Sequence, residues 1–294
     1  MPNDRNYYMV GLLCGISCMV IWGFLAIYWK SLFPISSFVI FLYRIVLTGA
    51  TAFIAALKVY GISGLKEPLK DKKTLIKLFL AGLIITINWN TYIYAINSGQ
   101  TIEASIGYYI EPLVICIFGI LLFKERPTGF KLISIIFAAI GVLIVLVHFM
   151  RLPVIALCLA LTFAIYTAIK KHLKMRPLIA LFYETIFIIP VALVLLIYAE
   201  VNGVGAIATG QPHQLLLLSF VGILTATPLA LFAVAANRIS MITIGIIEYI
   251  SPSITLLIGI FVFREAFDLI QLIAFVVIWI GLVFFTYGEV KWGS

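Results

Sequence analysis

The sequence predicts an all-α integral membrane protein with ten transmembrane helices, arranged as two inverted repeats of five helices. Three observations predict this fold. The 294 residues are 64% hydrophobic and 11% charged, whereas a soluble domain is about 45–50% apolar and about 25% charged. The apolar runs are about 20 residues long, which is the length of a membrane-spanning helix. The two halves of the chain also match each other at a fixed offset.

Apolar windows place the ten spans in chain order. They cover residues 8–28, 36–57, 75–96, 103–123, 129–148, 152–171, 178–199, 213–236, 243–263 and 268–287. The longest segment between spans, 58–74, is too short for a soluble domain. Any activity is therefore expected inside the bilayer.

Basic residues in the short connecting segments predict the orientation. With the N-terminus in the cytoplasm, sixteen Lys and Arg residues lie in inner segments and three in outer segments. Positive charge concentrates on the cytoplasmic side of membrane proteins. We therefore expect a multi-pass protein of the prokaryotic inner (cytoplasmic) membrane with both termini in the cytoplasm. The net charge of +8 then reflects topology, and no nucleic acid partner is expected.

The second half of the chain repeats the first at an offset of 140 residues. The matching pairs include Lys30 and Lys170, Tyr43 and Tyr183, Asn97 and Asn237, Pro112 and Pro252, Glu125 and Glu265, and Gly141 and Gly281. The repeats are expected at 8–148 and 152–287. Because each holds an odd number of spans, the second crosses the membrane in the opposite sense. Such inverted repeats are typical of secondary transporters, whose substrate site lies where the halves meet.

Four ionisable residues within the spans are candidate functional residues, because a charge near the bilayer centre costs about 2.5–3.5 kcal/mol. From helical rise, Arg44 and Glu111 share a level in the outer half, which predicts an ion pair. Glu184 and Glu248 share an inner level without an intramembrane cation, so at least one should hold a proton. This predicts a proton or cation site. The alternative is that Glu184 belongs to a hydrogen-bond network with Tyr166 or Lys170.

Prolines and aromatic residues extend this candidate site. Pro112 and Pro252, a repeat pair, are expected to break helices beside polar clusters, as transporters do at mid-membrane sites. The polar and aromatic residues expected to line a cavity are Trp22, Asn88, Trp89, Tyr92, Tyr109, Tyr166 and Tyr249. Aromatic rings beside carboxylates suit an organic cation. Ordinary aromatic packing is the alternative for each ring.

No pattern in the sequence predicts an enzyme. The chain has no G-x-S-x-G, H-E-x-x-H or P-loop motif. Its four cysteines have no metal-ligand spacing. We therefore expect neither a metal nor a cofactor.

Six strings spread over nearly the whole chain carry a family resemblance. They are Ile21-Trp22-Gly23, Tyr43-Arg44, Asn88-Trp89, the run from Glu103 to Leu113, Tyr183-Glu184-Thr185 and Glu248-Tyr249-Ile250-Ser251-Pro252. With them the chain resembles the RarD-type (chloramphenicol-sensitivity) branch of the drug/metabolite transporter superfamily, the EamA-domain proteins. The resemblance implies a central cavity lined mainly by the first, third, fourth, sixth, eighth and ninth helices, with the fifth and tenth as scaffold.

Two departures from that branch bear on the substrate. Glu111 stands where the branch usually has Asn, and Glu248 where it usually has Gln. Both add acid near the midplane and favour a cationic or zwitterionic solute.

The expected function is that of a secondary active transporter, moving a small organic metabolite or drug by alternating access, with possible proton coupling. The alternative is an uncoupled channel-like facilitator or a membrane receptor. The expected partners are the solute, the lipid bilayer and protons, and the expected assembly is a monomer or weak dimer.

Overall fold

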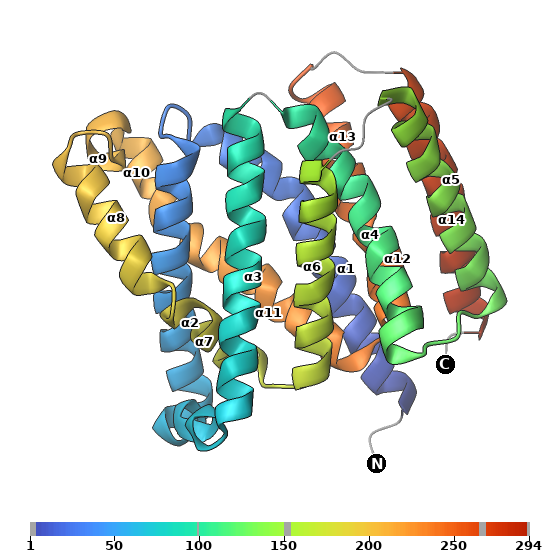
Figure 1. The fold of residues 1–294 in the computed structure, drawn as a ribbon, viewed down its shortest axis with the longest axis horizontal. Helices are drawn as coiled ribbons and strands as arrows, with labels where there is room; N and C mark the ends of the chain where they lie inside the picture. Colours follow the sequence, from blue (N-terminus) through green and yellow to red (C-terminus); the bar gives the residue numbers. More distant parts are fainter. Residues whose placement is uncertain (1–3, 99, 150–153, 265–268, 293–294) are drawn as a thin grey trace.

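The fold is a bundle of long apolar helices that brings both chain termini to the same end. A computed structural model describes residues 4–98, 100–149, 154–264 and 269–292. Within them, ten helical segments are long and apolar enough to cross a membrane, as predicted. Both termini lie at the lower end of the bundle in Figure 1, which an even number of crossings requires.

The first half contains five long helices close to the predicted spans. They are α1 (Asp4–Ser31), α2 (Ser37–Lys66), α3 (Lys72–Asn97), α4 (Thr101–Phe123) and α5 (Gly129–Phe149). The predicted loop at 58–74 is mostly helical instead. α2 continues to Lys66, with an interruption at Gly61, whose φ of 65° lies in the left-handed region that favours glycine. The 3₁₀ helix η1 (Glu67–Lys70) then leads to α3.

In the second half, three of the five spans consist of two helices in series. α6 (Val154–Leu173) and α14 (Leu269–Trp292) are single helices. The others are α7 (Pro177–Ile186) with α8 (Ile189–Val201), α10 (Pro212–Ser219) with α11 (Val221–Arg238), and α12 (Met241–Glu248) with α13 (Ile250–Phe261). A short helix, α9 (Ala206–Thr209), lies between α8 and α10. The predicted starts of the sixth and tenth spans, 152 and 268, lie outside the described residues.

The expected helix breaks at Pro112 and Pro252 need correction. α4 continues through Pro112 without a break. In the ninth span the helix is interrupted at Tyr249, and Pro252 lies in the first turn of α13. A proline in the first turn removes no intrahelical hydrogen bond, because the first N–H groups of a helix have no partner there. The break in the ninth span therefore precedes the proline.

Contacts between helices show the symmetry of the two halves. α1 packs against α11 as α6 packs against α3, and the last helices of the halves, α5 and α14, pack against each other. They run side by side along one edge of the bundle in Figure 1. The repeat pair of tyrosines is also in direct contact, since the Tyr249 hydroxyl donates to the Tyr109 carbonyl oxygen at 3.0 Å. The inverted five-helix repeat expected from the sequence is thus the fold.

Candidate functional site

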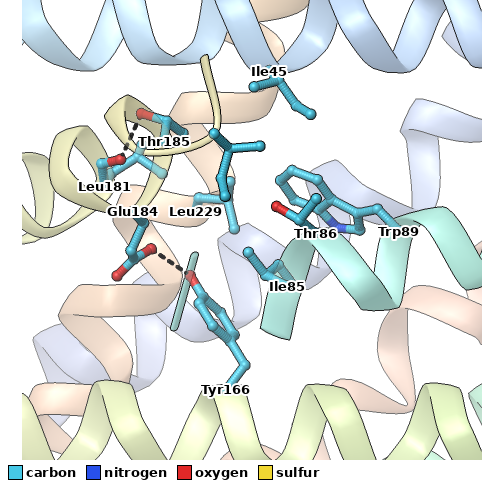
Figure 2. A pocket seen from close by; sticks show the side chains of 10 residues that line it. Ile45, Ile85, Thr86, Trp89, Tyr166, Leu181, Glu184, Thr185 and Leu229 are labelled. Atoms are coloured by element: carbon cyan, nitrogen blue, oxygen red, sulfur yellow. Dashed lines mark hydrogen bonds between the residues drawn. The ribbon is translucent and has the colours of Figure 1, made fainter. Parts of the chain in front are cut away.

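A cavity lies where helices of the two halves meet. Its lining comes from α2, α3, α6, α7 and α11 and consists of Ile45, Ile85, Thr86, Trp89, Tyr166, Leu181, Glu184, Thr185, Ile188 and Leu229. Figure 2 shows Glu184 and Tyr166 pointing toward each other on one side, with Trp89 and Thr86 on the other. The volume of about 10 Å³ is about that of one water-sized sphere. This cavity is therefore too small for an organic solute.

This lining differs in part from the expected set of helices. Trp89, Tyr166 and Glu184 were predicted to line a cavity, and they do. The resemblance did not imply contributions from α2 and α7, the second and seventh spans, although Arg44 and Glu184 on these spans were candidate site residues. α7 approaches α3 very closely, because a Cβ built on Gly82 would overlap the backbone carbonyl of Glu184. The glycine thus allows the contact that brings Glu184 to the cavity.

Glu184 is the acceptor of a fully buried ion pair. The Lys170 ammonium donates to its Oε1 at 2.7 Å, and the Tyr166 hydroxyl donates to its Oε2 at 3.1 Å. The side chains of Lys170 and Glu184 are 3% and 2% exposed. The predicted pairing of Glu184 with Glu248 is therefore wrong, and the alternative network is correct. Lys170 was assigned to the topology signal because it lies in the last turn of its helix. Its side chain instead points into the protein.

Glu248 pairs with Glu111 instead. Their carboxyl groups, from α12 and α4, are in hydrogen-bonding contact, and the residues are 5% and 6% exposed. Among the described residues, Oε2 of Glu248 has no hydrogen-bond partner. The prediction placed the two at different levels because it treated the spans as parallel and straight. α4 is inclined to α3 in Figure 1, and the ninth span changes direction at Tyr249.

Arg44 is surrounded by aromatic rings and does not contact Glu111. Its guanidinium lies 4.0 Å from the ring centre of Trp89 and 5.3 Å from that of Trp29. Within the described part of the chain, Nε of Arg44 is buried without a hydrogen-bond partner. The predicted ion pair between Arg44 and Glu111 is thus wrong. Depth along a helix axis does not specify the direction in which a side chain points.

Two predicted cavity residues of the first and third spans serve packing. Trp22 packs edge to face against Phe163 and at a tilt against Phe232, at 6.0 and 5.7 Å between ring centres. Asn88 donates to the Leu159 carbonyl at 2.8 Å and to Thr162 at 2.9 Å, so it connects α3 to α6. Neither lines the cavity.

The predicted tyrosines divide between two environments. Tyr109 and Tyr249 are buried in the cluster formed with α5 and α14, where Tyr109 lies 4.7 Å from Phe275. Neither lines the cavity beside Glu184. Tyr249 instead lines a second small cavity, between α4, α5, α12 and α14. Tyr92 instead pairs edge to face with Tyr108 at 5.8 Å, and both lie close to Arg44.

Sequence reasoning missed several residues of these groups. They are Trp29, Thr86, Tyr108 and Thr185, whereas Lys170 was named only as an alternative partner of Glu184. The repeat carries a signal for Lys170. An offset of 140 relates Lys30 to Lys170 and also Arg44 to Glu184, so each half has a pair of ionisable residues at equivalent positions.

Comparison with known proteins agrees with this architecture. The EamA-like transporter family matches residues 9–147 and 151–287. The uncharacterized transporter YojE of Bacillus subtilis is 38% identical over 288 residues, covering 96% of this chain and 95% of that protein. Protein RarD of Streptomyces exfoliatus is 31% identical, covering 98% and 91%. Protein RarD of Escherichia coli is 29% identical, covering 96% and 95%.

A solved crystal structure shares the fold. It covers 95% of this chain and 98% of its own, with a TM-score of 0.73 and 17% sequence identity. Matches to both halves, to relatives over nearly their full lengths and to this structure lead to one conclusion. The chain belongs to the EamA-like transporter family, in its RarD-type branch.

Proposed function

We propose that the protein is a proton-coupled secondary active transporter, which moves a small organic solute across the inner membrane by alternating access. The moving units are the repeats at 8–148 and 152–287. The observation that carries the proposal is the contact between the buried carboxyl groups of Glu111 and Glu248. One residue comes from each repeat, so the pair lies across the boundary at which the halves must separate.

The pair has the chemistry of a proton carrier. Two adjacent carboxyl groups in a medium of low dielectric constant cannot both ionise, because the two negative charges repel. In the closed structure they therefore share at least one proton. When α4 and α12 move apart and water enters, both groups regain hydration and the proton is released. A solute gradient and a proton gradient are then coupled through one conformational change.

The closed cavity supports a carrier. A channel keeps a continuous path, whereas this cavity has a volume of only about 10 Å³, so a solute needs a rearrangement to enter. Three spans of the second half are divided into shorter helices, and such discontinuities are where transporter helices bend. The proposal includes cytoplasmic termini, supported by sixteen basic residues in the inner segments against three in the outer ones.

Infrared spectroscopy tests the shared proton without knowledge of the solute. The purified protein is expected to show the C=O stretching band of a protonated carboxyl group at neutral pH. The band should be lost or shifted in Glu111→Gln and in Glu248→Gln. The matched control is Glu200→Gln, because Glu200 accepts hydrogen bonds from the Tyr43 hydroxyl and the Ala206 N–H. This change should leave the band unaltered.

Transport in proteoliposomes tests the coupling. Amino acids, amines and carboxylic acids are added to vesicles that contain a pH-sensitive dye, and active solutes are then used in counterflow. The wild-type protein should show saturable counterflow and solute-dependent proton movement. Glu111→Gln and Glu248→Gln should lose the proton movement and keep counterflow, which needs no net proton transfer. Flux that never saturates, or proton movement unchanged in both variants, would refute the proposal.

A further inference from the structure

We infer that Arg44 is the binding site for an anionic group of the solute, and that the group is a carboxylate. The inference rests on the proposed transport function and specifies its substrate class. It follows from the surroundings of Arg44, from the equivalent position in the other repeat, and from the position of Trp89 between Arg44 and the cavity.

The guanidinium of Arg44 has aromatic contacts and no carboxylate partner. It lies over the ring of Trp89 at 4.0 Å and near that of Trp29 at 5.3 Å. Within the described residues no carboxylate oxygen lies within ion-pair distance of it, and its Nε has no hydrogen-bond partner. The N–H donors of a guanidinium group lie in its plane and form a fixed fork. These donors match the two oxygens of a carboxylate.

The repeat shows what is missing at this position. The 140-residue offset relates Lys30 and Arg44 of the first half to Lys170 and Glu184 of the second. In the second half, cation and carboxylate form a buried ion pair at 2.7 Å. In the first half both equivalents are cations, and the Lys30 ammonium lies 3.6 Å from the ring centre of Phe263. The first half thus has a cation, Arg44, at the position where the second half has the carboxylate of Glu184, and a carboxylate of the solute would supply the negative charge at Arg44.

The position of Arg44 connects it to the cavity. Trp89, on which the guanidinium lies, also lines the cavity, and so does Ile45, the neighbour of Arg44 on α2. Tyr92 and Tyr108 lie close to Arg44, and their hydroxyl groups are in hydrogen-bonding contact with each other. A solute whose carboxylate binds Arg44 can thus place its remaining atoms beside Trp89 as the halves open.

Paired ligands test the charge requirement in the wild-type protein. Binding is measured by tryptophan fluorescence in a non-ionic detergent, with amino acids and simple carboxylates such as phenylalanine and benzoate, each compared with its amide. At least one carboxylate should bind saturably, and its amide about ten- to a hundredfold more weakly, which is the size expected for lost hydrogen bonds to a charged group. Equal affinity within every pair, or no saturable carboxylate binding, would overturn the inference.

Substitutions test the residue. Arg44→Lys keeps the charge but loses the planar fork, and Arg44→Gln loses both, so we expect affinity for the carboxylate to fall about tenfold in the first and further in the second. The matched control is Arg176→Gln, because Arg176 also lies over a ring, that of Tyr60 at 5.1 Å, away from the site. Its affinity should equal that of the wild type. Wild-type affinity in folded Arg44→Gln would overturn the inference.

The anion of a lipid headgroup shares part of this chemistry. Phosphatidylglycerol is therefore added in the same detergent without solute. Lipid binding that depends on Arg44, with no binding of any carboxylate, would overturn the assignment to a solute. A different result refutes the proposed function, because flux in proteoliposomes that does not saturate excludes a carrier. Saturable proton-coupled transport of amines alone would overturn only the role of Arg44.

Discussion

Removal of Lys170 should strongly destabilise the protein. In Lys170→Met the Glu184 carboxylate stays buried, with the Tyr166 hydroxyl, at 3.1 Å, as its one remaining side-chain donor among the described residues. Breaking a buried ion pair from one side costs about 3–5 kcal/mol. Because Tyr166 still satisfies one oxygen, we expect a loss near the lower end, about 3 kcal/mol. This is a large share of the total stability, which is about 5–15 kcal/mol for folded proteins.

The double variant Lys170→Met with Glu184→Met distinguishes two causes of the lost stability. One is the loss of the attraction between the two charges, and the other is the burial of an unpaired carboxylate. Replacing a whole buried pair by apolar residues is often neutral or stabilising. We therefore expect the double variant to be more stable than Lys170→Met alone. The free energy of unfolding is measured by tryptophan fluorescence in mixed micelles of a non-ionic detergent and SDS.

An exposed ion pair provides the control. Arg176 and Glu67 are 3.6 Å apart and their side chains are 52% and 57% exposed. Arg176→Gln should cost less than about 1 kcal/mol, as exposed pairs do. Two results would show that burial of the pair does not control stability. One is a loss in Lys170→Met as small as that in Arg176→Gln. The other is a loss in the double variant equal to the sum of the losses in Lys170→Met and Glu184→Met.

Two further predictions concern other parts of the structure. Gly82→Ala should lower the free energy of unfolding by about 1–3 kcal/mol, because the added Cβ would overlap the Glu184 carbonyl. Gly129→Ala, with nothing within 4 Å of its Cβ, should not lower it, and equal effects would contradict the close contact. Asp71, outside the spans, accepts from the Thr74 hydroxyl at 2.6 Å, and this hydrogen bond holds its pKa below the usual 3.8. The stabilisation by Asp71 should be present above that value and lost as pH falls through the lower folded pKa. The protection factors of the amides at the start of α3, which are corrected for the intrinsic exchange rate, should therefore fall in acid, and Asp71→Asn should remove this dependence.

The spans and the repeat could be predicted because the length of an apolar run and the matches between the two halves depend only on the order of residues along the chain. The side-chain pairs could not be predicted in the same way. Arg44 and Glu111 share a calculated depth, yet Arg44 points to Trp89 and Glu111 to Glu248. Residue spacing gives height within the membrane, whereas helix tilt and rotation decide which side chains meet. Both depend on packing between helices that are far apart in the sequence.

Lys170 illustrates a second limit. Lysines near the ends of spans usually extend toward water, so counting them as topology signals is correct for most of them. A buried acceptor reverses this preference, but an acceptor 14 residues away on another helix leaves no local pattern. The positions of Tyr109 and Tyr249 away from the cavity beside Glu184 have a related reason. Their helices also contact the α5 and α14 pair, and aromatic side chains fit both environments.

Among the described residues, the spans that consist of two helices in series all belong to the second half, with breaks beginning at Phe187, Phe220 and Tyr249. In the proposed alternating-access cycle, the two halves of the inverted repeat would exchange conformations. Subtracting 140 places the equivalent positions at Leu47, Leu80 and Tyr109, which lie inside the continuous helices α2, α3 and α4. The opposite-facing state would then straighten the second half and bend the first at these three positions. The same backbone would thus describe both end states, with the roles of its two halves interchanged.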